Sequence, residues 1–327
     1  MAIQQTLLSI IQTAQRELGL PVASTVVGNT DQTTVQMFGF ANQEIDELRQ
    51  AHDNGWTALQ KEYNLVVSPP VETTGDVALN SAVISNIPDT SSLLANYMMV
   101  SGPSIPAAAR IISIDSPTQI TMSMEATAAT SAADLTFSRD TYPEPSDFDS
   151  FINDTWWDRT NRWALLGPDS PQMDQWHRSG IVTFGPRRHF RQIGANASGV
   201  SGGLITQVNY RIWPPPSEIT SPLQLVFEYL SNGCVYVSGS FSNISYQFAN
   251  DADVPILNAR AIIMGIKWRF WQQKGFDWTG MRDDYTVYVE RLIARDGGAG
   301  KLQLAKPLYS VLINSYNVQD GNFPGNE

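Results

Sequence analysis

The spacing of apolar positions predicts helices near the start of the chain. Residues 3–18 place apolar side chains every three or four positions, and Gly19 and Pro21 then favour a helix end. Thr30-Asp31 offers an N-cap for a second helix, roughly 31–51. The inward-facing positions predicted for these two helices are Ile3, Leu7, Ile10, Ile11, Ala14 and Leu18, then Val35, Phe38, Ala41, Ile45 and Leu48.

Helical spacing is also found in three other places. A short helix is predicted from Trp56 to about Asn64. Near the far end, helices are predicted from Pro255 to about Lys274, ended by Gly275, and from about Thr279 to Arg295. Together with the first two, these helices indicate an α domain built from both ends of the chain.

Between these ends the pattern alternates between apolar and polar residues. From Val66 to Ser138 the only basic residue is Arg110, and short alternating runs are separated by turn residues, which is typical of a small antiparallel β domain. The predicted strand runs are 77–84, 97–102, 109–116, 119–124 and 134–139.

The middle of the chain mixes the two patterns. Residues 143–163 have a helical composition, and Ser170 can cap a helix that begins at Pro171. Residues 180–194, 204–216 and 223–237 then alternate and predict a β meander.

The sequence therefore predicts an α+β protein: a discontinuous helical domain from both chain ends, interrupted by a small inserted β-barrel or sandwich and by the β meander. The tail lacks a helical period and is too apolar for a disordered end, so we expect it to dock in extended form. The expected parts are 1–65, 66–140, 141–253, 254–298 and the tail, 299–327.

Composition and net charge exclude some classes of function and favour others. Only 16% of residues are charged, against about 25% in an average soluble protein, which favours a subunit with much surface buried against neighbours. The net charge of −11 argues against a sequence-specific DNA binder or an RNA coat, but not against a conduit for DNA. The N-terminal residues do not resemble a secretory signal, and no apolar window is long enough for a membrane span.

Candidate chemistry is sparse. The three histidines, His52, His177 and His189, lack metal-ligand spacing, so we expect exposed or capping roles for them. Cys234 lies in an apolar run and predicts a buried small side chain. No nucleophile elbow or phosphate-binding glycine loop is present. We therefore expect no catalytic residue, no cofactor and no metal.

Two clusters remain as candidate interaction residues. The basic cluster Arg187, Arg188 and Arg191, with Arg178 nearby, is either a solvated face or a site for an acidic neighbour or phosphate, and a protein neighbour is favoured over DNA. The second cluster is expected to be scaffold between the α and β parts, with local ion pairs Asp154–Arg159 and Asp158–Arg162. Its members are Phe148, Trp156, Trp157, Arg159, Arg162 and Trp163.

Three segments resemble tailed-bacteriophage head-to-tail connector (adaptor, neck) proteins. They read VVGNTDQTTVQMFGFANQEIDELRQAHDNGWTALQKEY at 26–63, YPEPSDFDSFINDTWWDRTNRWALLGPDSPQMDQW at 142–176, and IKWRFWQQKGFDWTGMRDDYTVYVERLIARDGGAG at 266–300. Residues 74–138, which include VSGPSIPAAARIISIDSPTQITMSM, resemble instead a small β module of phage structural proteins. Many connector relatives lack such a module, so its role is not carried over from them.

The resemblance implies a virion protein, made in the host cytoplasm and placed in the neck. Such adaptors form homo-oligomeric rings, commonly of twelve copies, beneath the portal protein. The ring extends the DNA channel used in ejection, without sequence-specific DNA binding, and attaches the tail or nozzle protein; no membrane is involved. The C-terminal tail would pair with the portal through residues among Leu308, Tyr309, Leu312, Tyr316 and Phe323.

Other functions stay open at this point. One is another neck or tail ring, such as a stopper or tube protein, which low helix content would favour. A second is a carbohydrate-binding fibre or decoration protein, suggested by the Thr/Ser-rich β module. An enzyme ranks third.

Overall fold

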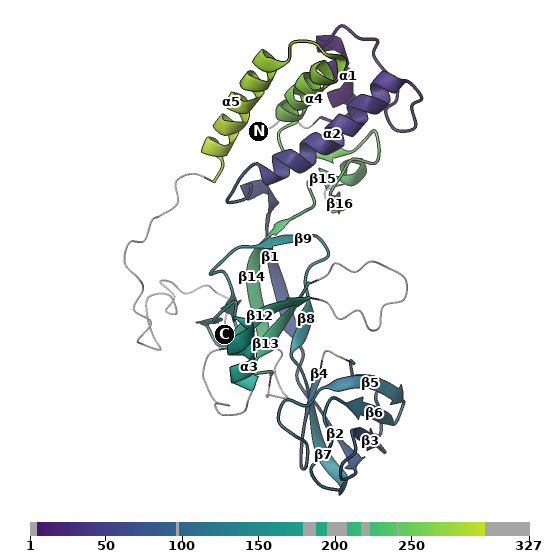
Figure 1. The fold of residues 1–327 in the computed structure, drawn as a ribbon, viewed down its shortest axis with the longest axis vertical. Coiled ribbons are helices and arrows are strands. Elements are labelled where there is room, and N and C mark those ends of the chain that lie inside the picture. Colours follow the sequence, from purple (N-terminus) through teal and green to yellow (C-terminus); the bar gives the residue numbers. More distant parts are fainter. Residues whose placement is uncertain are drawn as a thin grey trace, which may run out of the picture. The chain divides into compact units, whose positions relative to one another are not determined.

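The computed structural model describes residues 5–95, 98–178, 188–194, 208–216, 223–240 and 242–297. These residues pack as two units, and Figure 1 labels most of their elements. The helical unit takes 5–61, 147–151 and the described part of 228–297; the β unit takes the described parts of 62–146 and 152–227. Five α-helices and antiparallel sheets confirm the α+β class for the described chain, while the finer five-part division stays a prediction.

The helical unit joins the two ends of the chain in one apolar core. Side chains cap its first two helices. Thr6 Oγ1 accepts from Ser9 N at 3.3 Å, and the Asp31 carboxylate accepts from Thr34 N at 2.9 Å, which confirms the cap predicted for the second helix. Its helices are α1 (Leu7–Glu17), α2 (Gln32–Gln50), α4 (Ala259–Lys274) and α5 (Thr279–Arg295), with short 3₁₀ turns η1 (Thr57–Leu59) and η2 (Val237–Gly239).

Helix α4 is the central element of this unit and contacts α1, α2 and α5 (Figure 1). It is apolar on most of its circumference, as a helix surrounded by others must be. Ile262, Ile266 and Phe270 of α4 share the core with Met37 and Ile45 of α2. By contrast, α5 buries only Val289.

Short strands complete the helical unit. Strands β16 (Ile244–Ser245), β15 (Val235–Tyr236) and β17 (Val254–Pro255) form a three-stranded sheet in that order. Strand β9 (Phe148–Phe151) pairs with the end of β14 (Leu223–Ser231), the strand that crosses from the β unit. Cys234, next to β15, is fully buried as predicted, and burial raises the pKa of its thiol to about 12.

The β unit begins with β1 (Gln60–Val67), which crosses the unit boundary, and a six-stranded antiparallel sheet follows in the order β4-β7-β2-β3-β6-β5. The edge strands approach at one bridge between Met99 and Arg110, and the described strands form no continuous closed barrel. A separate β domain at 66–140 stays a prediction. Its strands are β2 (Val71–Val77), β3 (Val83–Ser85), β4 (Met98–Ser101), β5 (Ile111–Ser116), β6 (Gln119–Met122) and β7 (Thr130–Arg139).

Two smaller sheets complete the β unit. One has the order β1-β14-β10-β11 and the other the order β12-β13-β8. One short helix, α3 (Pro171–Arg178), lies between β11 and β12 in sequence. The strands not yet bounded are β8 (Thr141–Pro143), β10 (Trp157–Asp158), β11 (Trp163–Ala164), β12 (His189–Gly194) and β13 (Val208–Trp213).

The helix predicted over 143–163 is wrong: this stretch contains β9, β10, β11 and turns. Asp154 and Arg162 have φ of 62° and 60°, which a right-handed helix does not allow. The Asp158 carboxylate accepts from the backbone N–H of Asn161 at 2.9 Å and stabilises a turn instead of a helix.

Three smaller expectations also need correction. The helix expected over 56–64 is only the turn η1 followed by β1. Val35 is 48% exposed, and Met37 takes a buried place in α2 instead. Helix α4 starts after Asn258, whose side chain caps Arg260 N at 2.9 Å, because the residues near Pro255 pair as a strand.

Candidate functional site

The strand pair β12–β13 has two chemically different faces. Its register pairs His189 with Trp213 and Arg191 with Arg211, so these four side chains share one face. The alternate residues lie on the opposite face, where Phe190, Tyr210 and Ile212 are buried in an aromatic core with Trp156 and Phe227. The polar face is therefore left for helix α3.

Helix α3 turns its polar side inward. Asp174, His177 and Arg178 recur at helical spacing, and Asp174 and Arg178 are buried. Met173 and Trp176, the large apolar residues of the helix, are each 46% exposed. The predicted cap holds, since Ser170 Oγ accepts from Met173 N at 3.3 Å. This short helix is thus anchored through charged and polar groups.

Asp174 joins α3 to both strands. Its carboxylate contacts Arg178 Nε at 2.9 Å, Arg191 Nη1 at 3.0 Å and Arg211 Nη1 at 3.4 Å. Burial alone would raise the pKa of Asp174, but the three guanidinium groups outweigh burial and lower it. Asp174 therefore stays ionised within the interface.

Asp140 forms the second centre of this ionic network. Fully buried, it contacts Arg110 at 2.5 and 2.8 Å and Arg178 Nη1 at 3.0 Å. Burial lowers the pKa of Arg110, although Asp140 opposes that shift. Arg178 thus connects Asp140, at the end of the six-stranded sheet, with Asp174 in α3.

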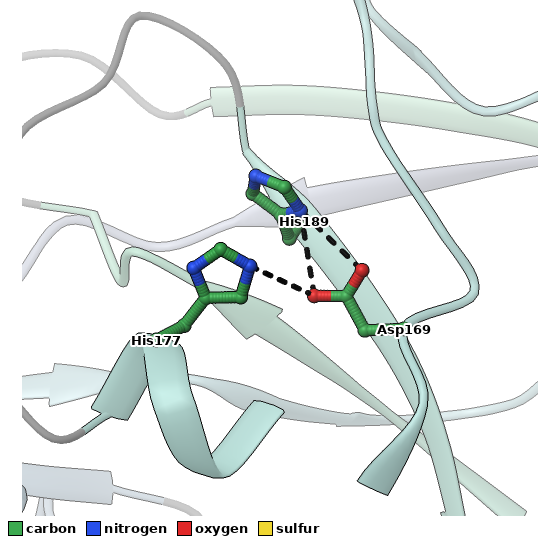
Figure 2. Close-up of side chains that lie close together, drawn as sticks. All are labelled: Asp169, His177 and His189. Carbon is green, nitrogen blue, oxygen red and sulfur yellow. Dashed lines mark hydrogen bonds and ion pairs between the residues drawn. The ribbon is translucent and has the colours of Figure 1, made fainter. Parts of the chain in front are cut away.

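Asp169 forms a cluster with His177 of α3 and His189 of β12 (Figure 2). The Asp169 Oδ2 atom is 3.5 Å from His177 Nε2 and 3.4 Å from His189 Nδ1. The two imidazole rings are 4.2 Å apart, and the three side chains are 12 to 22% exposed. Two imidazole nitrogens and one carboxylate oxygen are ligands that first-row divalent metals accept.

The backbone fixes Asp169 over β12. Its N–H donates to the Phe190 carbonyl at 2.9 Å, and Phe190 N–H donates to Leu166 O at 2.9 Å. Gly167 makes this close approach possible, because its φ is 146° and a Cβ there would lie 2.5 Å from the Phe190 carbonyl oxygen. The carboxylate is thus held beside His189 by a paired segment.

The histidine cluster was missed by the sequence reasoning. The expected capping role fits His52, whose Nδ1 accepts from Asn54 N at 3.1 Å, but not His177 and His189, which meet at Asp169. Their separation in sequence follows no metal-binding motif. The available signal was that His177 shares a helix face with Asp174 while His189 shares a strand face with Arg191, but sequence alone does not pair that helix with that strand.

The residues of the second predicted cluster, expected to be scaffold, lie in different parts of the fold. Trp156 is 2% exposed and stacks on Phe227 and Phe190 with ring centroids 4.2 and 4.7 Å apart. Phe148 stacks on Tyr229 in the helical unit, whereas Trp157 and Trp163 lie in β10 and β11.

The two local ion pairs expected in this segment are wrong. Arg159 pairs with Glu62 at 2.8 Å, not with Asp154. Asp158 binds Asn161, and Arg162 is exposed. The difference at Asp158 and Arg162 follows from the turn that replaces the expected helix, since residues four apart are neighbours on a helix. Asp154 and Arg159 are five residues apart, a spacing that a helix would not bring together either.

The predicted interface residues are only partly described. Arg188 Nη1 donates to Pro214 O at 2.5 Å and Pro215 O at 3.2 Å, and Arg191 pairs with Asp174, so both make contacts within the β unit. The others, Arg187, Leu308, Tyr309, Leu312, Tyr316 and Phe323, lie outside the described residues, as does the 299–327 tail.

A buried carboxylate marks the helical unit. Glu44 of α2 is fully buried, and burial raises its pKa to about 7 although Arg269 Nη2 lies 2.8 Å away. Gly265 of α4 leaves the room for it, because a Cβ there would come within 2.0 Å of the Glu44 carboxyl carbon. Arg269 also contacts Glu47 at 2.5 Å, so it links two acids of α2 to α4.

Comparison with known proteins adds no relative: no family model matches the chain, and no curated protein matches it significantly. In the described part of the chain, none of the helices has the length and apolar character that crossing a membrane requires.

Proposed function

We propose that this chain is a structural virion protein that forms the head-to-tail adaptor ring of a tailed bacteriophage. The ring would sit beneath the portal protein, extend the DNA channel and present the attachment surface for a tail or nozzle protein. The portal, the tail protein and further copies of the chain are the partners, and no catalytic step is part of this role.

One observation carries the proposal. Two of the segments that resemble connector proteins, 26–63 and 266–300, are far apart in sequence, yet their described helices belong to the same unit. Helix α2 packs against α4, and α4 packs against α5. Two resembling segments that pack together are expected when they form one working part, and this supports reading the helical unit as the connector domain. The third resembling segment, 142–176, lies mainly in the β unit.

The surface of the helical unit is consistent with a ring subunit. Helix α5 buries a single residue, Val289, and carries the exposed Val287, while Phe276 just before it is 59% exposed. In a ring, each subunit meets two neighbours, and a helix lying on the outside of a subunit gains burial there. The low charge content of 16% favours the same use of surface.

The charge suits a DNA conduit. With a net charge of −11, the chain lacks the basic footprint that holds nucleic acid in place. A channel that repels phosphate lets DNA slide, which ejection requires. The finer architecture belongs to the same proposal: the six-stranded module is an insertion carried by the helical connector domain, and the tail, 299–327, docks on the portal.

Two alternatives are less well supported. A tube protein would be mostly β, whereas the described chain has four helices in one unit. A carbohydrate-binding protein needs a ligand pocket, which usually includes aromatic side chains. The shallow hollow described in the β module, between Thr90 and Ser116, is lined without any aromatic residue.

Electron microscopy of the chain with its portal protein tests the proposal. We expect the chain alone to stay monomeric and to form a ring when portal rings are added, with density between portal and tail in virions. Finding the protein only on fibres or on the capsid lattice would overturn the adaptor role.

Truncation after Ala299 tests the tail separately. We expect a folded, soluble subunit that no longer joins the portal, because an extended tail supplies backbone hydrogen bonds to its partner. The matched control replaces Leu308 and Leu312 with Asp in the full chain, which keeps the length but removes apolar anchors. If the truncated protein joins the portal with unchanged affinity, the tail has no docking role.

A further inference from the structure

The Asp169, His177 and His189 cluster has the geometry of a metal site. The three donor atoms come from the loop before α3, from α3 itself and from β12, and all lie within 4.8 Å of one another. We propose that these residues bind one divalent transition-metal ion, Zn²⁺ by its ligand chemistry, which fastens α3 to β12. This proposal is independent of the adaptor role.

The distances favour an ion over direct hydrogen bonds. Charge-assisted N–H···O bonds are about 2.7–2.9 Å long. Asp169 Oδ2 is instead 3.5 Å from His177 Nε2 and 3.4 Å from His189 Nδ1, and the hydrogen bond between His189 Nδ1 and Asp169 Oδ1 is also long, at 3.4 Å. Ligand atoms about 2.0–2.2 Å from a tetrahedral zinc ion lie about 3.3–3.6 Å from one another. The two spacings from Asp169 Oδ2 therefore match edges of a coordination tetrahedron, and the three donor atoms all lie within 4.8 Å of one another.

A second observation points the same way. His177 Nε2 is buried and makes no hydrogen bond within the described residues, although it faces the Asp169 carboxylate (Figure 2). Leaving a buried polar atom unsatisfied is costly, so such atoms usually have a partner. A metal ion bound between His177 and Asp169 would satisfy this nitrogen.

The surroundings hold the ligands in place. Asp169 is tied to β12 by the hydrogen bond from its N–H to Phe190 O at 2.9 Å, and His189 is fixed in the ladder opposite Trp213. His177 lies on a helix whose neighbouring residues Asp174 and Arg178 are locked in ion pairs. Preorganised ligands of this kind bind metal without a large ordering cost.

The donor set selects the class of metal. Ca²⁺ and Mg²⁺ prefer oxygen ligands, whereas two imidazoles and one carboxylate suit Zn²⁺ and its neighbours in the first row. Arg191, on the same face of β12 as His189, is paired with Asp174 at 3.0 Å, which compensates its charge near the ion. Three protein ligands leave a fourth position for water.

The test uses the full chain without a histidine tag, stripped with a chelator and titrated with Zn²⁺ and with Co²⁺. We expect one ion per chain, the visible absorption of tetrahedral Co²⁺ and a rise in melting temperature with Zn²⁺. Asp169→Asn, His177→Gln and His189→Gln should each weaken binding at least about tenfold, since even outer-sphere changes cost 10–100-fold.

His52→Gln is the matched control. His52 also faces a carboxylate, Asp296, at 4.0 Å, but no second histidine is grouped with that pair. This variant should keep full metal binding. Failure of the wild-type chain to bind stoichiometric Zn²⁺, or equal loss in His52→Gln, overturns the proposal.

X-ray absorption of the Zn²⁺-loaded wild-type chain is the second measurement, and it decides the matter if a site variant does not fold. Two imidazole ligands support the assignment, and a shell without imidazole contradicts it. Neither result depends on whether the chain joins a portal.

Discussion

The central helix of the helical unit and helix α3 of the β unit are held in place by different kinds of contact. Helices from distant parts of the sequence meet through aliphatic side chains, and Ile262 and Ile266 of the central helix are fully buried. Helix α3 meets its strands through Asp174 and Arg178, while its large apolar residues face outward. The first interface is non-directional, whereas the second depends on fixed ion-pair geometry.

The contrast follows from helix length. An isolated eight-residue helix is too short to be stable, and α3 also buries little apolar surface. Its position must come from directed ion pairs and hydrogen bonds. Such contacts fix the helix in one position against the strands, but much stability is lost when a single partner is removed. The 16-residue helix α4 is held by its large buried apolar surface. Its packing energy is spread over many weak contacts, so a single substitution removes only a small part of it. We therefore expect the β unit to be more sensitive to charge changes.

The largest effect is expected from Asp140→Asn. This change keeps the side-chain shape but removes the carboxylate charge that faces Arg110 and the buried Arg178, although Arg178 keeps its contact with Asp174. Removing one partner of a buried pair costs about 3–5 kcal/mol. Urea unfolding monitored by tryptophan fluorescence gives the free energy of unfolding.

The matched control for that change is Asp134→Asn, which alters an exposed Asp in strand β7. It should change the free energy of unfolding by less than about 0.5 kcal/mol. If the two variants lose equal stability, the ionic network does not hold the β unit.

The next effect concerns Glu44 and pH. Burial raises its folded pKa from 4.5 to about 7, so the folded state binds a proton that the unfolded state lacks between these values. The contribution of Glu44 to stability is therefore greatest below pH 4.5 and falls by roughly 3 kcal/mol as pH rises to 7, at about 1.4 kcal/mol per pKa unit. Glu44→Gln should remove this slope, measured by hydrogen exchange of the α4 amides.

Glu17→Gln is the control for the pH experiment. Burial of Glu17 is outweighed by Lys267 and Arg260, which lower its pKa, so its stabilising contribution is lost only as pH falls below 4.5. This variant should leave the slope between pH 4.5 and 7 unchanged. Parallel pH profiles for wild type and Glu44→Gln would show that Glu44 stays ionised beside Arg269.

The same contrast explains what could be predicted from the sequence. Apolar periodicity found α1, α2, α4 and α5, because each follows a regular stripe or a clear cap. It failed over 143–163, where positive φ at Asp154 and Arg162 and an Asp158 side-chain bond decide the conformation. Side-chain hydrogen bonds of this kind stabilise turns in place of a helix, and they leave no periodic pattern of apolar residues in the sequence.

The candidate site was harder to predict for a related reason. His177 and His189 lie on different elements, and only the pairing of α3 with β12 brings both to Asp169. Charged residues ordinarily mark an exposed helix face, so the inward position of Asp174 and Arg178 reverses the usual rule. A single sequence does not show that reversal.

Gly265→Ala tests how closely helix α4 packs against Glu44 of α2 in the helical unit. A new Cβ would lie within 2.0 Å of the Glu44 carboxyl carbon, so the overpacked core should lose about 1–3 kcal/mol. The loss should shrink in the double variant with Glu44→Ala, as expected for directly contacting residues. Thermal unfolding of the two single variants and the double variant measures the coupling.

Gly39→Ala provides the control, since nothing lies within 4 Å of a Cβ at this position in α2. Alanine there should stabilise the protein by about 0.5–1 kcal/mol through helix propensity. If Gly265→Ala is also stabilising, the close fit between α2 and α4 around Glu44 is wrong.

The smallest effect is expected from Arg159→Ala. Arg159 and Glu62 form a pair at 2.8 Å with about half of each side chain exposed, at 48% and 50%. Exposed pairs contribute about 0–1 kcal/mol and weaken with salt. A double-mutant cycle with Glu62→Gln in low and high salt should therefore give a small coupling that disappears in high salt. Arg178→Ala, an identical change at a buried arginine with two aspartate partners, should cost several times more. If Arg159→Ala and Arg178→Ala lose the same free energy of unfolding, burial does not decide how much an ion pair contributes in the β unit. The proposed difference between exposed ion pairs and the buried ionic network would then be wrong.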